Sequence, residues 1–258
     1  MPKLAANLSF LFTEVSFLDR FAAARGNGFD AVEFLFPYAF GTEAIAERLA
    51  RYNLQTVLHN FPSGDWNAGD RGLACDPRRI SEFQDSVGLA LEYALELNVP
   101  RLHCLAGLLP EAIAPELAHA TYVANLRQAA AALDAHGLQL LIEPINHFDM
   151  PGYFLTSSDQ AAAVIAEAGA PNLAMQFDMY HLQRMGEDVA HALQAHFPLI
   201  GHVQLADLPG RNEPGSGAMD WRSLLSLLDG MGYRGWVGCE YHPRADTIAG
   251  LAWRSAMA

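Results

Sequence analysis

Residues 138–181 contain the pattern that decides the fold: the apolar stretch LQLLIEP (138–144), the loop INHFDMPGYFLT (145–156), a helical segment that begins at Ser157 or Ser158, and a second apolar stretch, LAMQFDMYH (173–181). A short apolar run, a helix and another short apolar run are typical of a βαβ unit, whose two strands lie parallel beneath the helix. Serine is a preferred N-cap residue, which supports this helix start. The stretch therefore predicts a parallel sheet.

The same alternation extends from this stretch to both ends of the chain. Eight strand-then-helix units without a linker predict one closed (β/α)8 barrel domain over residues 1–258. The alternative is an open doubly wound sheet, but no GxGxxG or GxxxxGK[ST] motif follows the first strand. The expected strands are 4–12, 31–36, 54–60, 101–107, 138–144, 173–181, 200–207 and 235–243, and the expected helices include 17–28, 42–53 capped by Thr42, 80–97, 115–136 closed by Gly137, and 246–253.

The composition excludes several classes of protein. The formal net charge of -13 opposes binding to nucleic acid, and no basic cluster interrupts it. No apolar run approaches the roughly 20 residues of a membrane span, and the first residues do not resemble a secretory signal. We therefore expect a cytoplasmic protein without a membrane partner. Cys75, Cys104 and Cys239 lack CxxC spacing, so we expect them to be reduced and buried.

The lysine content restricts the chemistry. Lys3, at the start of the chain, is the sole lysine, so Schiff-base chemistry has no candidate inside the fold. Carbonyl chemistry here needs another electrophile, either a metal ion or a set of hydrogen-bond donors.

Polar residues stand at the carboxyl ends of four consecutive predicted strands, where a barrel builds its active site. These residues are Glu143, Asp178, Gln204 and Glu240. Because strand side chains alternate, all four can point into the barrel mouth together. Three carboxyl groups in a partly dry pocket require a cation, and oxygen ligands without sulfur favour magnesium or manganese. The alternatives are a metal-free carboxylate pair and, for each residue alone, a helix cap, an ion pair or a core amide.

Histidines and arginines form a second set of candidates. His59 and His181 lie at the ends of strands, where neutral imidazoles can donate to a developing enediolate oxygen. Arg211 and Arg71 lie in loops at the same end of the barrel and can bind the carboxylate of a small anionic substrate. For each residue, the alternative is an ordinary hydrogen-bonded or solvated loop side chain.

The segments ANLSFLFTE, VEFLFPYAF, LHNFPSGDWNAGDRG, LIEPINHFDMPGYFLT, QFDMYHLQRM, GHVQLADLPGRNEPGSG and GWVGCEYHP resemble the hydroxypyruvate isomerase family, among the xylose-isomerase-like TIM barrels. This resemblance covers nearly the whole chain in order. It implies reversible conversion of hydroxypyruvate to tartronate semialdehyde, with Glu143 and Glu240 as the acid/base pair. It also implies that Glu143, Asp178, Gln204 and Glu240 match positions that bind a divalent ion in metal-containing relatives.

A sister family acts on 2-oxo-tetronates and shares the motifs FTEV, DAVEFLFPY and GWxGCEY. The segments EPINHFDMPG and HNFPSGDW resemble the hydroxypyruvate branch more closely. Sugar 3-epimerases of this fold carry histidine where this chain has Gln204. The resemblance to enzymes that act on free ketoses is therefore weaker.

Two rival functions follow from the same pattern. An apurinic-site endonuclease would need a basic groove and a richer cluster of metal ligands, which the acidic charge opposes. A non-catalytic sugar-acid binding protein would have no need of paired carboxylates. The expected partner is therefore a small 2-oxo acid substrate. Among protein partners, a second copy of the chain in a homo-oligomer stays open.

Overall fold

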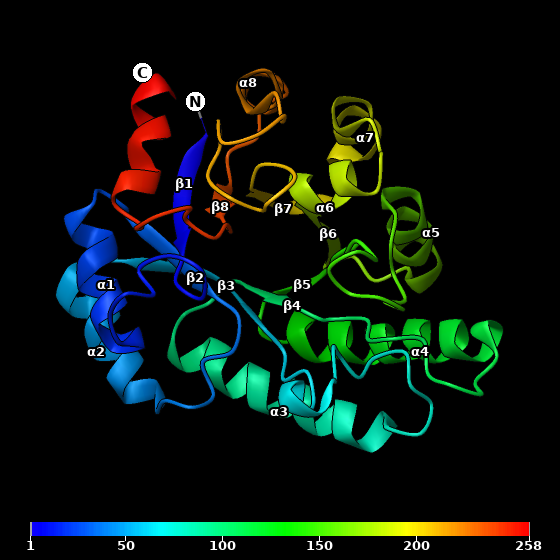
Figure 1. Cartoon of the computed structure of the whole chain (residues 1–258). Helices are drawn as coiled ribbons and strands as arrows, with labels where there is room; N and C mark the ends of the chain where they lie inside the picture. The colour runs from blue at the N-terminus through cyan, green and yellow to red at the C-terminus, as the bar shows by residue number, and fades with distance from the viewer. Residues whose placement is uncertain (1, 258) are drawn as a thin grey trace.

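Eight parallel strands form a closed barrel in the computed structural model, which describes residues 2–257 (Figure 1). Each strand pairs with the next, and β8 pairs with β1. Closure leaves no exposed strand edge. The closed barrel expected from the sequence is thus confirmed, and the open sheet is wrong. The strands are β1 (Lys3–Asn7), β2 (Ala31–Phe34), β3 (Gln55–Asn60), β4 (Arg101–His103), β5 (Gln139–Ile142), β6 (Leu173–Asp178), β7 (Ile200–Leu205) and β8 (Trp236–Cys239).

Helices surround the barrel on its outside, and the C-terminal segment lies beside the N-terminal strand (Figure 1). The α-helices are α1 (Phe17–Gly26), α2 (Thr42–Tyr52), α3 (Ile80–Glu96), α4 (Pro115–Asp134), α5 (Ser158–Ala168), α6 (Met179–Arg184), α7 (Val189–His196) and α8 (Trp221–Gly230), and the 3-10 helices are η1 (Trp66–Ala68), η2 (Phe197–Leu199) and η3 (Ala249–Met257).

Helix ends show where local reasoning succeeded and failed. Ser157 is the N-cap of α5, and its hydroxyl accepts a hydrogen bond from the backbone N–H of Gln160, as expected. The expected cap at Thr42 is wrong, because Gly41 occupies the N-cap position and Thr42 is the first helical residue. The last helix begins at Ala249 rather than at Asp246, whose side chain instead accepts from the backbone N–H of Ala249.

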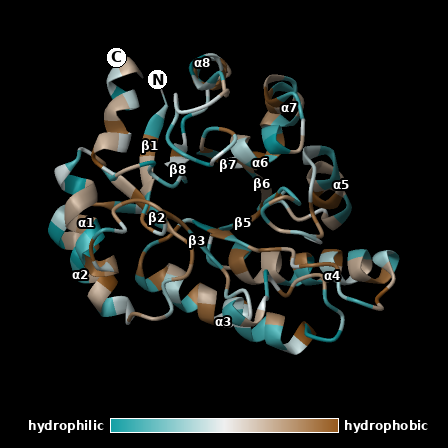
Figure 2. Ribbon diagram, viewed as in Figure 1, coloured by the Kyte–Doolittle hydropathy of each residue, from teal (hydrophilic) through white to brown (hydrophobic). Residues whose placement is uncertain are grey.

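Two apolar clusters hold the barrel together. The larger lies between the strands and the helices, and Figure 2 shows the helices alternating between hydrophobic and hydrophilic residues around it. The smaller includes Ala5, Ala31, Leu141 and Ala174, with Trp236 packed against it. Leu141 is fully buried, which stabilises the fold by about 1.5–3 kcal/mol relative to an exposed side chain.

The barrel interior changes character along its length. Ala5 and Asn7 share one face of β1, and Leu141 precedes Glu143 by two residues along β5, so the small apolar cluster continues into polar side chains toward the carboxyl ends of the strands. Apolar packing fills the barrel interior beneath the carboxyl ends of the strands, and those ends carry the polar groups of the site. The site therefore has a rigid floor.

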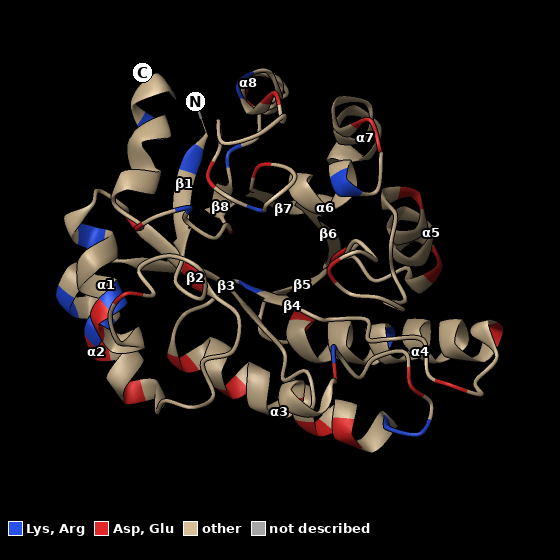
Figure 3. Cartoon of the chain, in the orientation of Figure 1, with Lys and Arg blue, Asp and Glu red and all other residues tan. Residues whose placement is uncertain are grey.

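Other expectations concern the surface and the cysteines. All three cysteines are free and buried, as expected. Acidic side chains are prominent on α3 and α5 (Figure 3). None of the described helices is long and apolar enough to cross a membrane.

Candidate active site

The structure brings the four strand-end residues together at the carboxyl end of the barrel. Glu143 follows β5, Asp178 ends β6, Gln204 lies on β7 and Glu240 follows β8, and all four are buried. The Gln176 amide nitrogen donates to Glu143 Oε2 (3.0 Å) and to Gln204 Oε1 (2.6 Å). The Gln204 amide nitrogen donates in turn to Glu240 Oε2 (2.5 Å). A continuous chain of hydrogen bonds therefore joins β5 to β8.

A fourth carboxyl group, Glu33 of β2, lies beneath this chain and was missed by the sequence reasoning. It is fully buried and accepts from Asn7 Nδ2 (3.0 Å) and Gln204 Nε2 (2.8 Å), while His202 Nε2 lies 2.7 Å from its second oxygen. The available signal was a glutamate inside the apolar segment AVEF, because a buried charged residue needs partners. Glu33 fixes the orientation of the Gln204 amide.

Gly238 of β8 leaves room for the Glu33 side chain. A Cβ atom at this position would collide with both carboxyl oxygens of Glu33. Glycine is therefore required here by the close approach of a buried side chain rather than by an unusual backbone conformation.

Arg211 supplies the positive charge of the site. Its Nη2 atom lies 2.5 Å from Glu240 Oε1, 3.4 Å from Asp178 Oδ2 and 3.2 Å from His181 Nε2. The guanidinium also lies over the rings of Phe10 (4.9 Å) and Tyr180 (5.2 Å). The structure thus places the predicted Arg211 and His181 beside the carboxyl groups.

Asp207 shapes the loop that carries Arg211. Its buried carboxylate accepts from the backbone N–H groups of Leu208 (2.8 Å), Gly215 (2.8 Å), Gly217 (3.0 Å) and Met219 (2.9 Å). Four donors on one carboxylate draw both ends of the loop together. Sequence reasoning missed Asp207, which ends the expected seventh strand but turns away from the carboxyl cluster into its own loop.

Burial raises the pKa of the three carboxyl groups. Desolvation raises the pKa of Glu240 to about 8, opposed by Arg211 and reinforced by Asp178. The pKa of Glu143 lies well above its usual range because the group is buried and because Glu240 and Asp178 lie nearby. Burial also raises the pKa of Asp178, while Arg211 opposes the change. The cluster therefore retains protons near neutral pH, which suits a pair that both accepts and donates a proton.

The histidines of the site are neutral. Burial lowers the pKa of His181 well below its usual range, and the Arg211 charge lowers it further. The amide of Asn146 lies 2.6 Å from His181 Nδ1 and orients the ring. His103, which the sequence analysis did not select, has a pKa lowered to about 3 by burial, and its Nδ1 lies 3.5 Å from Glu143 Oε2.

The side chains fit a divalent cation. Potential ligand atoms of Glu143, Asp178 and His181 lie within 4.8 Å of one another, and Glu143 Oε1 is buried without a hydrogen-bond partner. Carboxyl oxygens suit a hard ion such as magnesium or manganese. This group differs from the set expected from the sequence. His181 joins it, whereas the Gln204 side-chain oxygen accepts from Gln176 and Glu240 contacts Arg211.

The structure does not bring His59 or Arg71 into contact with the carboxyl cluster. The His59 ring stacks on Phe34 and meets Tyr38 edge-on, because it lies on the helix-facing side of β3. Burial lowers its pKa to about 4. Arg71 donates to the backbone oxygens of Trp66 and Asp70, and its guanidinium lies 4.0 Å from the Trp66 ring centre. Strand alternation and local packing thus direct both residues elsewhere.

Comparison with known proteins assigns the family. Residues 21–257 match the model described as "Xylose isomerase-like TIM barrel". The chain is 49% identical to the 2-oxo-tetronate isomerase of Cupriavidus necator over 253 residues, which is 98% of this chain and 97% of that protein. It is 46% identical to the hydroxypyruvate isomerase of Escherichia coli, covering 98% of each. A crystal structure titled AP endonuclease, family 2, from Brucella melitensis has a TM-score of 0.97 and 44% identity, covering 99% of each chain.

The chain therefore belongs to the xylose isomerase-like TIM barrel family. Within it, the chain is an isomerase of the hydroxypyruvate and 2-oxo-tetronate isomerase type.

Proposed function

We propose that this chain is a hydroxypyruvate isomerase, which interconverts hydroxypyruvate and tartronate semialdehyde with Glu143 and Glu240 as the acid/base pair. The observation that carries the proposal is the convergence of these two buried carboxyl groups, both with raised pKa values, on a mouth where Arg211 supplies the positive charge. A site that only bound a sugar acid would gain nothing from this carboxyl pair, because a carboxyl group that ionises beside an anionic ligand repels it.

Arg211 and His181 are the substrate-binding groups. The guanidinium binds the substrate carboxylate, exchanging its contact with Glu240 for one with the substrate. The neutral His181 imidazole, held by Asn146, lies close enough to Glu143 and Asp178 to donate to an oxygen that becomes negative in the enediolate. Neither His59 nor Arg71 enters this proposal.

Proton transfer proceeds between the two substrate carbons. One glutamate in its ionised form removes a proton from C3 of hydroxypyruvate, and the electrons form the C2–C3 double bond of the enediolate. The other, protonated glutamate returns a proton to C2, while the hydroxyl proton passes from the C3 oxygen to the C2 oxygen. The product is tartronate semialdehyde, and atoms and charge balance without a redox partner.

A bound magnesium or manganese ion would polarise the substrate carbonyl and stabilise negative charge on its oxygen. Glu143, Asp178 and His181 are the residues that would hold it. A ligated His181 Nε2 would carry no proton, so the ion would then replace its hydrogen bond to the substrate oxygen. Glu240 and Gln204, also expected from the sequence as ligands, instead contact Arg211 and Gln176. Glu143 can serve both purposes because its two oxygens have different surroundings. Oε2 accepts from Gln176, and Oε1 has no partner.

A second candidate substrate is a 2-oxo-tetronate, which is one hydroxymethyl group longer. The 49% identity to the Cupriavidus necator 2-oxo-tetronate isomerase favours it. The chemistry at C2 and C3 is the same in both acids, so the carboxyl pair would act in the same way. The substrates differ only in the space required beyond C3.

Solvent-deuterium incorporation tests the proposal. EDTA-treated enzyme is incubated in D2O with hydroxypyruvate or a 2-oxo-tetronate, with and without magnesium or manganese, and exchange is followed by NMR. Fast exchange into hydroxypyruvate supports the proposed function. Exchange confined to the longer acid supports the second candidate substrate, the 2-oxo-tetronate. Exchange into neither acid contradicts both candidate functions.

The carboxyl pair is tested by Glu240→Gln and Glu143→Gln. Each should lower turnover by about 10²–10⁴-fold, because general acid/base catalysis contributes that much. Glu116→Gln, at the exposed start of α4, is the matched control and should leave turnover unchanged. Retained turnover in either site variant would remove the acid/base assignment.

A further inference from the structure

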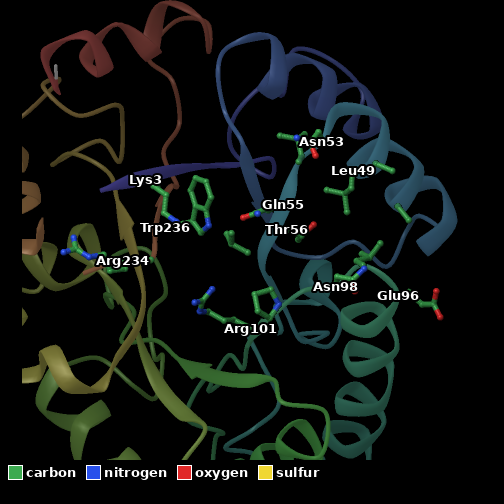
Figure 4. A pocket seen from close by; sticks show the side chains of 17 residues that line it. Lys3, Leu49, Asn53, Gln55, Thr56, Glu96, Asn98, Arg101, Arg234 and Trp236 are labelled. Carbon is green, nitrogen blue, oxygen red and sulfur yellow. The ribbon is translucent and has the colours of Figure 1, made fainter. Parts of the chain in front are cut away.

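A cavity lies at the opposite end of the barrel from the carboxyl cluster. Its volume is about 770 Å³, and its walls come from the first residues of β1, β3, β4 and β8 and from the ends of α2 and α3 (Figure 4). The catalytic proposal uses none of these residues. The apolar cluster of Ala5, Leu141 and their neighbours separates the two ends.

The charge of this cavity is opposite to that of the chain. Three cationic side chains, Lys3, Arg101 and Arg234, line it against one carboxylate, Glu96. The whole chain has 16 Lys and Arg residues against 29 Asp and Glu residues. In the described part of the chain, no carboxylate forms an ion pair with any of the three cations. The cavity therefore carries uncompensated positive charge.

Two of the cations are positioned by the barrel itself. Lys3 and Trp236 are register partners on β1 and β8, and the Lys3 ammonium lies 4.7 Å from the centre of the Trp236 ring. Arg101 opens β4 on the same face as His103, so it points to the barrel axis, and its Nε atom is buried without an acceptor. A buried donor without an acceptor is unfavourable, and an anionic ligand would supply the missing acceptor.

Neutral polar groups continue the cavity away from the cations. Thr56 is 6% exposed, and its hydroxyl has no hydrogen-bond partner. The amides of Asn53, Gln55 and Asn98 also line this part (Figure 4). Hydroxyl and amide groups suit a ligand with several hydroxyl groups. The volume falls within the range of small-molecule sites, roughly 300–1,000 Å³.

We propose that this cavity binds a phosphorylated sugar or sugar acid, with the phosphate at Lys3 and Arg101 and the hydroxyl groups toward Thr56 and the amides. A purely structural role for the cations would be to balance the carbonyl ends of α2 and α3. The Arg101 Nε atom has no acceptor in the described structure, and the Lys3 ammonium lies over the Trp236 ring, so the geometry favours a ligand.

Binding is measured on the full-length protein with glucose 6-phosphate, inorganic phosphate and glucose as probes, at constant ionic strength. Calorimetry gives the affinity, and tryptophan fluorescence reports on Trp236. Glucose 6-phosphate should bind more tightly than phosphate or glucose alone. Trp236→Phe should remove most of the fluorescence response and leave a measurable heat of binding.

The cations are tested by Arg101→Gln and Lys3→Gln. Each should weaken binding of glucose 6-phosphate by roughly tenfold, the value of one hydrogen bond to a charged group. Arg222→Gln is the matched control, because its guanidinium also lies over a tryptophan ring, 4.6 Å from the centre of Trp221. Lys3 is exposed, so Lys3→Gln keeps the test available if Arg101→Gln does not fold.

Three results would overturn the proposal. The first is an absence of saturation below about 10 mM glucose 6-phosphate, which is weaker than specific small-molecule binding. The second is an equal loss of affinity in Arg222→Gln, which would indicate a general charge effect. The third is phosphate binding as tightly as glucose 6-phosphate, which would remove the sugar from the proposed ligand. Isomerase activity is not a readout here, so this test is independent of the proposed function.

Discussion

Arg211 and Glu240 contact each other in a partly buried pair at the mouth of the barrel, with Nη2 of the arginine 2.5 Å from Oε1 of the glutamate. The two residues are 29 positions apart and come from the loop after β7 and the end of β8. The same nitrogen also approaches Asp178 and the neutral His181, so one positive charge lies beside two acidic groups. This arrangement makes Arg211 both the counter-ion of the free site and the binding group for an anionic substrate.

Arg211→Met should therefore raise KM for the 2-oxo acid by about tenfold or more, since a charge-assisted contact contributes about 1.5–3 kcal/mol. It should also raise the pKa of Glu240, because the arginine opposes the effect of burial there. Steady-state kinetics over a range of pH measures both effects. Arg222→Met, on α8, is the control. An unchanged KM would show that Arg211 does not bind the substrate.

Metal affinity should rise with pH. The pKa values of Glu143 and Asp178 are raised, so these groups keep protons to a higher pH, and a divalent cation must displace them. Binding of magnesium or manganese should release protons, and the affinity should increase with pH as these carboxyl groups ionise. Calorimetry in buffers of different ionisation enthalpy counts the released protons. Zero release would place the ion away from this cluster.

Gly238→Ala should destabilise the protein by about 1–3 kcal/mol, the usual cost of overpacking a buried position. The added methyl group would displace the Glu33 carboxyl group and, with it, the Gln204 amide. Urea unfolding measures the free energy, and activity should fall in the variant that remains folded. Gly230→Ala is the control, because nothing lies within 4 Å of a methyl group there. Equal stability of both variants would contradict the close packing.

Asp207→Asn should loosen the loop that presents Arg211, because an amide has one acceptor oxygen in place of two and turns an N–H group toward backbone donors. We expect faster hydrogen exchange at Gly215, Gly217 and Met219 and a higher KM. The Arg211 variant would raise KM without the change in exchange. Unaltered exchange at these amides would remove the role assigned to Asp207.

Asp70 pairs with Arg79 through two hydrogen bonds of 2.7 and 2.8 Å, which lower the pKa of the Asp70 carboxyl group. A lowered pKa in the folded state stabilises the protein above the unfolded-state pKa of about 4, and this contribution is lost as the pH falls through the folded-state pKa. Asp70→Asn should cost about 1 kcal/mol at neutral pH and less in acid. The exposed Asp85→Asn is the control for urea unfolding at both pH values. A cost independent of pH would contradict the ion-pair explanation.

The sequence predicted those residues of the candidate site whose position follows from the order of the strands alone. Glu143, Asp178, Gln204 and Glu240 end consecutive strands, and parallel strands bring such ends to one mouth. Glu33 escaped notice because it sits inside a strand, and its partners Asn7 and His202 are 26 and 169 residues away. No local pattern connects residues at such separations.

The sequence by itself determined the alternation of strands and helices, and with it the barrel, because hydrophobic periodicity and turn residues act locally. Tertiary structure decided the rest. Closure of the barrel placed Arg211 against Glu240 and gathered Lys3 and Arg101 around the opposite end. Side-chain direction and burial depend on which strands become neighbours, and those neighbours exist only once the barrel has closed.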